Sequence, residues 1–315
     1  MKIVVTGALG HIGSRLIREL PLRLPAVEVV MIDSLATQRY ASLFDLPSTS
    51  RYQFVEGNVL TDDLAPHFVD ADVVVHLAAI TDAEASVEQK ERVDRENFSG
   101  TERVARACLL SGSNMIFPSS TSVYGTQRSQ VDEDCSPAEL KPQSPYAETK
   151  LREESLLASL AESEGLRQIT FRFGTIVGPS PGMRFHTAVN KFCWQAAMRQ
   201  PLSVWRTALD QKRPYLDLDD AVAAICFAIE QKLFDGRVYN VVTANRTIRE
   251  ITEMIRDQTG DLKIELVDSP IMNQLSYEVV AERFAAAGFV VQGDLRRAIG
   301  ETLALLRAAG STPRC

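Results

Sequence analysis

Residues 2–13 read Lys2-Ile-Val-Val-Thr6-Gly7-Ala-Leu-Gly10-His-Ile-Gly13. The β-branched run that ends at Thr6 predicts a strand, and the glycines directly after it mark a turn into a helix. Gly7 permits a tight turn, Gly10 lets the backbone approach a pyrophosphate, and Gly13 lets the helix pack closely on the strand. The stretch therefore predicts the first strand, turn and helix of a dinucleotide-binding sheet.

An acidic residue completes this pattern. Asp33 closes the second predicted strand, about 20 residues after Gly13, where such sheets place the carboxylate that accepts from the ribose hydroxyls. A carboxylate there repels a 2′-phosphate, so we expect NAD rather than NADP as the cofactor. The alternative is a glycine turn that only packs a helix on a sheet, with Asp33 as a solvated strand end.

The following residues repeat the alternation of short apolar runs and longer helical patterns. Strands are expected at 3–6, 29–32, 52–55, 73–76, 115–118 and 169–173. Helices are expected at 14–20, 96–110 and 146–161. This alternation is typical of βαβ units, which build a parallel sheet covered by helices on both faces. The expected fold class is α/β, a Rossmann-type doubly wound parallel sheet with a smaller, mostly helical C-terminal substrate domain.

The alternation loosens after Gly178-Pro-Ser-Pro-Gly182. Helices are expected at 187–198 and 218–230, and strands at 238–242 and near 263–267. The strand at 238–242 is expected to return to the sheet, and the residues from 247 onward are otherwise expected to be helical. The second domain is thus woven from more than one segment.

We predict the following division of the chain. Residues 1–178 form an NAD-binding Rossmann domain, and 214–243 return to it. Residues 179–213 and 244–315 form the substrate domain.

Composition excludes several classes of protein. The chain has 315 residues, 45% of them hydrophobic, and a formal charge of −7 without a run of Lys or Arg, which argues against nucleic acid as a partner. The five cysteines are widely spaced, and the histidines lack metal-ligand spacing, so neither a disulfide framework nor a metal site is expected. No signal peptide or membrane span is recognisable, so we expect a cytoplasmic location and no membrane partner.

A tyrosine and a lysine four residues apart form a candidate acid/base pair. Tyr146 and Lys150 lie on one face of a predicted helix, because side chains at i and i+4 share a face. Ser144 and Pro145 before them are typical of an N-cap and a first-turn proline, so the helix is expected to begin with the tyrosine. A lone pair of this kind is weak evidence, and its position downstream of the glycine pattern strengthens it.

Several motifs together resemble the extended short-chain dehydrogenase/reductase family, specifically the NAD-dependent nucleotide-sugar epimerases and dehydratases such as UDP-glucose 4-epimerase. The resemblance covers nearly the whole chain, and the motifs occur in the family's order and spacing. They are residues 6–13, 76–79, 97–101, 119–125, 146–150, 172–179 and 213–220.

The resemblance implies roles for individual residues. Ser120 hydrogen-bonds the reacting sugar, Tyr146 is the base and Lys150 orients the nicotinamide ribose, so these three are the expected catalytic residues. The expected cofactor contacts are Gly7, Gly10, His11, Ile12, Gly13, Asp33, Ser34, Asn58, Val59, Leu77, Ala78, Ala79, Tyr146 and Lys150. The expected substrate contacts are Thr81, Ser120, Thr121, Thr175, Arg184, Trp205 and Arg213.

Two substrate contacts have alternatives. Relatives use an arginine at the place of Arg213 to grip the nucleotide diphosphate, which suits a guanidinium, but a helix-capping or surface role is open. Trp205, at the end of a strand expected at 201–205, either stacks on the nucleotide base or packs in the interior. Asp219 and Asp220 are explained by the dipole of the helix that begins beside them.

The chemistry of Tyr146 follows from charge. A tyrosine of pKa ~10 is a poor base at neutral pH, whereas a nearby ammonium and a cationic nicotinamide stabilise its phenolate. We expect Lys150 to supply much of this charge. Tyr124 is expected to pack the strand end and is assigned no chemistry.

The sequence also departs from the family. Relatives usually have an aspartate at Asn58 and an amide at Thr175, and Gly174 replaces a bulky ring, so the sugar pocket is expected to be reshaped. Asp82 and Glu84 stand where the family lines its sugar site, and they either recognise sugar substituents or form a solvated loop.

The leading hypothesis is a nucleotide-sugar epimerase that oxidises a carbinol at C4 and returns the hydride to the other face. The alternatives are a dehydratase or oxidoreductase on a similar substrate, or a non-catalytic NAD-binding sensor. Dehydratases of the family place an Asp-Glu pair after the serine or threonine, whereas Thr121 and Ser122 follow Ser120 here. A homodimer is expected through the helices at 96–110 and 146–161, which would cover apolar residues. These are Val104, Ala107, Leu151 and Leu156.

Overall fold

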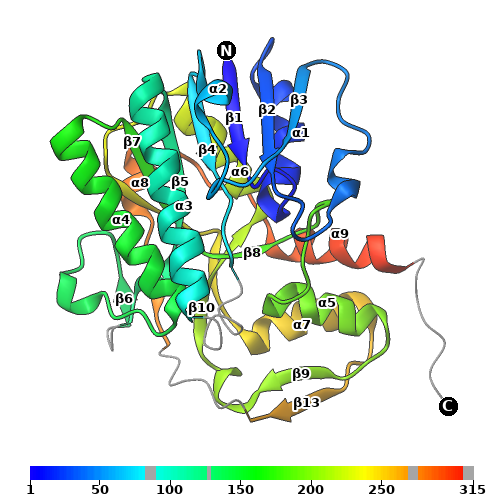
Figure 1. The fold of residues 1–315 in the computed structure, drawn as a ribbon. Coiled ribbons are helices and arrows are strands. Elements are labelled where there is room, and N and C mark those ends of the chain that lie inside the picture. The colour runs from blue at the N-terminus through cyan, green and yellow to red at the C-terminus, as the bar shows by residue number, and fades with distance from the viewer. Residues whose placement is uncertain (82–89, 126–128, 269–275, 308–315) are drawn as a thin grey trace.

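A computed structural model describes residues 1–81, 90–125, 129–268 and 276–307. Its centre is a seven-stranded sheet in the order β11-β7-β5-β4-β1-β2-β3, with all neighbouring strands parallel (Figure 1). The strands are β1 Lys2–Thr6, β2 Glu28–Asp33, β3 Arg51–Glu56, β4 Val73–His76, β5 Asn114–Ser120, β7 Gln168–Phe173 and β11 Val238–Val241. The predicted α/β fold class is confirmed, and the strand predicted at 238–242 returns to the sheet.

Helices cover both faces of this sheet, and the inner strands bury side chains on both sides. Ile3 and Val5 of β1 pack in one core with α1 and α6, while Val4 between them packs in the opposite core with α3 and α4. The helices of this unit are α1 His11–Arg23, α2 Ala65–Phe68, α3 Lys90–Ser111, α4 Pro145–Glu164, α6 Leu218–Glu230 and α8 Glu282–Ala286.

A second unit with its own core lies at the carboxyl ends of the central strands (Figure 1). Its helices are α5 Ala188–Ala197, α7 Ile248–Thr259 and α9 Leu295–Arg307.

Outside the central sheet, short strands pair in the orders β12-β10-β8, β13-β9 and β14-β6. They are β6 Gln130–Val131, β8 Thr175–Val177, β9 Leu202–Trp205, β10 Lys212–Asp217, β12 Ala244–Thr247, β13 Ile264–Val267 and β14 Glu278–Val279. The 3-10 turns are η1 Tyr40–Leu43, η2 Thr121–Val123, η3 Pro137–Glu139 and η4 Arg206–Ala208.

The sequence missed five short strands, β6, β8, β10, β12 and β14. The segment β12, Ala-Asn-Arg-Thr, has no alternation of apolar and polar residues, and it is a strand because it pairs antiparallel with β10. The prediction that residues from 247 onward contain one strand was therefore wrong, because β14 pairs with β6, far away in the sequence. Helix α4 begins at Pro145 rather than at Tyr146.

The packing of the C-terminal segment bears on the predicted domains. Phe284 and Phe289, predicted to belong to the substrate domain, pack in the core of the central sheet. Their ring centroids are 4.5 Å apart, and that of Phe284 is 5.1 Å from that of Phe171 on β7. The chain therefore touches the central sheet again at 284–289. The division into two domains stays a prediction.

One residue predicted to lie in a dimer interface is unavailable for it. Val104 is fully buried in the core beneath α3 of the single chain, so no partner can cover it. The apolar period of a helix does not distinguish a face turned to its own sheet from one turned to another subunit. The homodimer itself stays a prediction.

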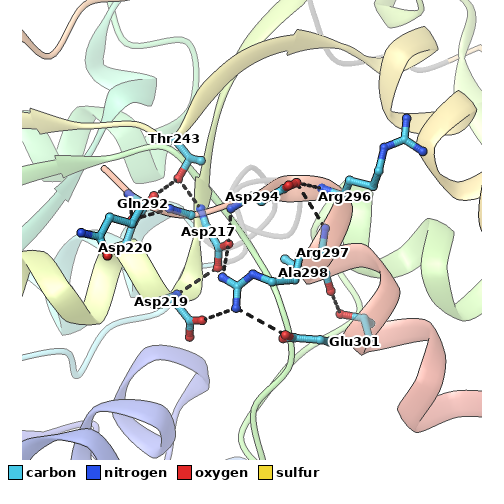
Figure 2. Close-up of polar contacts among 12 residues, drawn as sticks. Asp217, Asp219, Asp220, Thr243, Gln292, Asp294, Arg296, Arg297, Ala298 and Glu301 are labelled. Carbon is cyan, nitrogen blue, oxygen red and sulfur yellow. Dashed lines mark hydrogen bonds and ion pairs between the residues drawn. The ribbon is translucent and has the colours of Figure 1, made fainter. Parts of the chain in front are cut away.

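A buried polar junction joins the start of α6 to the start of α9 (Figure 2). The carboxylate of Asp220 accepts from the Gln292 and Gly293 amides, both at 2.9 Å, and from the Thr243 hydroxyl at 2.6 Å. Asp217 caps α6 and accepts from the Asp294 amide at 2.9 Å, and burial raises the pKa of its carboxyl. The dipole of α6 is therefore not the whole explanation for the acidic residue at position 220. The Asp220 carboxylate also holds the distant segment at 292–293 through hydrogen bonds.

We expect Asp220→Ala to lower the free energy of unfolding by about 3 kcal/mol, because the Gln292 and Gly293 amides and the Thr243 hydroxyl would all lose an acceptor that is itself buried. The neighbouring Asp219→Ala is the matched control. Asp219 lies at the surface and pairs with Arg15 and Arg297, so its removal should cost about 1 kcal/mol or less. Urea unfolding measures both values, and equal losses would contradict the assigned role of Asp220.

Candidate active site

A cavity of about 840 Å³ lies at the carboxyl ends of the central strands, between the sheet and the second unit. Ligands of open α/β sheets bind at this edge. The cavity is lined by every residue predicted to contact cofactor or substrate. These are Gly7, Gly10, His11, Ile12, Gly13, Asp33, Ser34, Asn58, Val59, Leu77, Ala78, Ala79, Thr81, Ser120, Thr121, Tyr146, Lys150, Thr175, Arg184, Trp205 and Arg213.

The glycine loop is fitted to a close backbone approach. Gly7 has φ +66°, and a Cβ there would lie 2.5 Å from the Ala78 amide nitrogen. A Cβ at Gly13 would lie 2.6 Å from the Gly7 carbonyl oxygen, so the helix meets the strand only through glycine. Among the described side chains none caps α1 at Gly10, which leaves the positive end of the helix dipole for an anion. These features fit the diphosphate of a dinucleotide.

Asp33 lies beside this loop, held by two backbone amides. Its carboxylate accepts from Leu9 and Leu35, both at 3.0 Å. Arg39 lines the same part of the cavity and was missed by the sequence analysis. Burial and then the charge of Arg184 lower the pKa of Arg39 to about 10, while Asp33 raises it. The residue stands in a segment without helix or strand periodicity, so no sequence signal marked it.

A turn from the second unit docks directly on the glycine loop. The His11 Nε2 lies 2.7 Å from the Gly178 carbonyl oxygen. Burial lowers the pKa of His11 to about 4, so the ring is neutral at physiological pH and donates to this carbonyl. Ser14 accepts from the Gly182 amide at 2.9 Å, and Ser180 donates to the His11 carbonyl at 2.8 Å. The sequence analysis missed these serines, because their partners lie more than 160 residues away.

The first turns of α4 place the candidate acid/base pair on the cavity wall. Ser144 caps the helix and accepts from the Ala147 amide at 3.2 Å, as predicted. The Lys150 Nζ lies 6.0 Å from the ring centroid of Tyr146 and 3.1 Å from a carboxylate oxygen of Glu153. The pair therefore includes a third member that the sequence analysis did not identify.

The charge around Tyr146 includes groups whose effect the sequence analysis did not identify. Burial and then the negative charge of Glu153 raise the pKa of the Tyr146 phenol, and the positive charge of Arg184 lowers it. The Lys150 ammonium lies beside the Glu153 carboxylate. The expectation that Lys150 supplies much of the charge that stabilises the phenolate stays a prediction.

The hydroxyl groups that follow β5 have different partners. Ser120 accepts from the amide and the hydroxyl of Ser122, at 3.2 and 2.9 Å. Its own proton is thus directed away from Ser122 and can be donated to a ligand. Thr121 instead donates to the Phe173 carbonyl oxygen at 3.2 Å and is buried. Its hydroxyl is used inside the protein, although the residue lines the cavity.

The remaining predicted substrate contacts come from five segments. Arg184 donates to the Thr81 hydroxyl across the cavity. Arg213 donates to Gln211 at 3.0 Å, and its guanidinium carbon lies 5.6 Å from the ring centroid of Tyr277. Thr175 lies on β8, and Trp205 ends β9. Arg184 and Arg213 both line the cavity, and two guanidinium groups there fit an anionic ligand.

The glycine that replaces a bulky ring has a packing role. A Cβ at Gly174 would lie 3.0 Å from the Pro214 carbonyl oxygen, so close approach to β10 favours glycine at this position. The proposed reshaping of the sugar pocket stays a prediction. Asp82 and Glu84, which were considered for this pocket, lie outside the described residues.

A buried network behind the site explains two other motif residues. Arg172 pairs with Glu154 at 2.6 Å and donates to the Tyr124 hydroxyl at 2.9 Å. Tyr124 donates to Asn240 at 2.9 Å. Tyr124 thus has the packing role that the sequence predicted.

Two negative findings hold for the described part of the chain. No group of three or more His, Cys, Asp or Glu side chains there could hold a metal ion. No helix in the same residues is long and apolar enough to cross a membrane. The cysteines that the structure describes, Cys108, Cys135, Cys193 and Cys226, are free thiols.

A Rossmann-type sheet whose glycine loop, strand-end carboxylate and Tyr-Lys helix meet at one cavity defines a short-chain dehydrogenase/reductase fold. A family model described as NAD dependent epimerase/dehydratase family matches residues 3–241. The chain therefore belongs to that family, which confirms the predicted family and its cofactor, NAD.

Individual relatives are similar over most of this chain. It is 32% identical over 270 residues to an uncharacterized UDP-glucose epimerase, YtcB, of Bacillus subtilis, covering 82% of this chain and 83% of that protein. It is 28% identical over 304 residues to the trifunctional UDP-glucose 4,6-dehydratase/UDP-4-keto-6-deoxy-D-glucose 3,5-epimerase/UDP-4-keto-L-rhamnose-reductase RHM2 of Arabidopsis thaliana, covering 91% of this chain and 44% of RHM2.

A solved structure of UDP-glucuronic acid 4-epimerase from Bacillus cereus, in complex with UDP-glucuronic acid and NAD, has a TM-score of 0.86 with this chain. The two are 28% identical, and the match covers 98% of this chain and 100% of that one. At these identities the family is shown, and the reaction within it is not fixed.

We expect the protein to bind NAD more tightly than NADP, because a 2′-phosphate would face the Asp33 carboxylate. Asp33→Asn keeps an acceptor for one backbone amide while it removes the charge. The ratio of the affinities for NAD and NADP should therefore fall by about tenfold or more. Calorimetry with both cofactors measures this ratio. Asp45→Asn, an exposed carboxylate outside the cavity lining, should leave it unchanged. Equal affinities of the unmodified protein for NAD and NADP would refute the role of Asp33.

Proposed function

We propose that this protein is an NAD-dependent nucleotide-sugar epimerase. It oxidises a carbinol of the sugar, at C4, and returns the hydride to the opposite face of the ketone. The observation that carries the proposal is the convergence of Ser120, Tyr146 and Lys150 on one cavity, with Thr121 and Ser122 rather than carboxylates after the serine.

The residues have distinct tasks in this reaction. Tyr146 takes the proton of the sugar hydroxyl as the carbon loses a hydride, and it returns the proton when the hydride comes back. Ser120, whose proton points away from Ser122, donates to the same sugar oxygen. NAD, when bound, accepts and returns the hydride and brings a cationic nicotinamide. Arg213 is placed to hold a phosphate of the nucleotide.

Elimination of water needs more than this site offers. A dehydratase requires an acid for the leaving hydroxyl and a base for the neighbouring carbon-bound proton. Ser122 is an alcohol, which does not titrate in the range of carboxylates, and the Thr121 hydroxyl is occupied by the Phe173 carbonyl. The similarity to YtcB and to the Bacillus cereus 4-epimerase supports the epimerase, whereas the RHM2 name includes a dehydratase.

We expect Tyr146→Phe to lower turnover by at least about 100-fold, because the change removes the ionisable oxygen and keeps the ring. NAD binding and thermal stability should change little. Tyr40→Phe, an exposed tyrosine outside the cavity lining, is the control and should keep full turnover. If Tyr146→Phe turns over within a few-fold of the unmodified enzyme, another residue is the base.

We expect incubation with nucleotide-diphosphate sugars and NAD to yield an isomer of unchanged mass, because the hydride and proton removed from the sugar are both returned. A panel of such sugars, analysed by mass spectrometry and NMR, identifies the substrate and the inverted carbon. A product lighter by one water would establish a dehydratase and direct attention to Asp82 and Glu84. Consumption of NAD equal to product formed would indicate a dehydrogenase.

A further inference from the structure

A buried carboxylate lies behind the lysine of the active site. Glu153 is 0% exposed and Lys150 is 3% exposed, and the Lys150 Nζ lies 3.1 Å from the Glu153 Oε2. The ammonium also lies 4.4 Å from the ring centroid of Phe117. Lys150 is therefore enclosed by one carboxylate and the faces of two aromatic rings, those of Phe117 and Tyr146.

A line of hydrogen bonds holds this carboxylate from the other side. Thr101 on α3 donates to the Glu153 Oε1 at 2.5 Å, and the His76 Nε2 lies 3.1 Å from the Thr101 hydroxyl. The His76 Nδ1 lies 2.7 Å from the hydroxyl of Thr6 on β1. The Ala78 amide, on the cofactor side of the cavity, reaches that hydroxyl at 3.5 Å.

The hydrogen bonds in this line have only one consistent assignment of donors and acceptors. The Thr101 hydroxyl has a single proton and gives it to the carboxylate, so it accepts from the His76 Nε2 proton. The Nδ1 of a neutral imidazole is then an acceptor and takes the Thr6 proton. Burial and then the charge of Lys150 lower the pKa of His76 to about 3, so the ring stays neutral. The line thus adds hydrogen bonds to Glu153 without adding charge.

The charged groups around Tyr146 come from two segments. Lys150 and Glu153 lie on α4 with it, and Arg184 faces it from the loop before α5. The ammonium of Lys150 and the carboxylate of Glu153 are close enough to act on the phenol largely as a neutral pair. The positive charge of Arg184 lowers the pKa of the phenol.

We propose that Glu153 is a positioning residue of the active site: held by Thr101 and His76, its carboxylate fixes Lys150 and cancels most of the ammonium charge that would otherwise act on Tyr146. The inference rests on the proposed roles of Tyr146 and Lys150. It implies that the phenol stays protonated until further positive charge enters the cavity, as a bound cationic nicotinamide would provide. Proton removal is thereby coupled to occupancy of the cofactor site.

Stability is a poor alternative explanation for this pair. Burying two charges costs solvation free energy, and the attraction between the charges often does not compensate for this cost. Apolar residues of similar size often stabilise a fold as well as a buried ion pair does. Glu154, the residue after Glu153 on α4, pairs with Arg172 and so connects the helix to β7. Glu153 instead faces the functional lysine.

The experiment measures the ionisation of the Tyr146 phenol directly. After a rapid pH jump, the ultraviolet absorbance of phenolate is recorded before unfolding, and the curve of the matching Tyr146→Phe protein is subtracted. Glu153→Gln keeps the size and the acceptor of the side chain and removes its charge. The midpoint of Tyr146 should fall by about one pH unit or more, because the ammonium is no longer cancelled.

Glu148→Gln is the matched control. Glu148 lies on the same helix, two residues from both Tyr146 and Lys150, but it is exposed and pairs with Lys90 at 3.0 Å. Solvent and ions screen its charge, so the midpoint should stay unchanged. An unchanged or higher midpoint in Glu153→Gln, or equal shifts in both variants, would overturn the proposal.

The unmodified protein gives a second test that needs no folded Glu153 variant. Its Tyr146 midpoint without NAD should lie above the ordinary value of ~10 and should fall when NAD is added. A midpoint below that value without NAD would mean that Lys150 is not neutralised, and would overturn the proposal. The result is separable from the proposed function: Tyr146→Phe with normal turnover refutes the base, whereas the change of midpoint from the unmodified protein to Glu153→Gln tests the role of Glu153.

Discussion

The structure depends on how closely three backbone segments approach one another at the glycine loop. A Cβ at Gly182 would lie 2.2 Å from the Leu9 carbonyl oxygen, and one at Gly7 would meet the backbone of Ala78. These contacts bring the end of β1, the loop after β4 and the turn of the second unit together. The cavity exists because glycine alone allows all three to meet. Two hydrogen bonds stabilise this arrangement: the Asp33 carboxylate accepts from the Leu9 amide, and the His11 ring donates to the Gly178 carbonyl.

Successive turns of helix α4 carry residues with different roles at the site. Tyr146 and Lys150 face the cavity, Glu153 supports the lysine, and Glu154 anchors the helix to Arg172 on β7. Each buried charge on this helix has an opposite charge within hydrogen-bond distance or close to it, as the low polarity of the interior requires. The same helix that carries Tyr146, the proposed base, therefore also carries charges that act on it.

Local patterns predicted the central sheet well. The strands β1 to β5 and β7 and the helix α6 follow from runs of β-branched residues and from the apolar period of helices, because both faces of the sheet are buried. The short strands β6, β8, β10, β12 and β14 could not be predicted, since they are strands through pairing with distant segments. The burial of Val104 and the contacts of Asp220 escaped prediction for the same reason.

The sequence by itself determined the fold class and the family, and it identified many of the residues that line the cavity, because spacing along one strand, turn or helix sets these patterns locally. Only the tertiary structure decided the electrostatics. The spacing of Tyr146 and Lys150 suggested a cation beside a phenol, but Glu153 changes this balance and is itself held by Thr101 and His76. Sequence distance cannot predict such coupling, because the energy of a buried charge depends on every group around it in space.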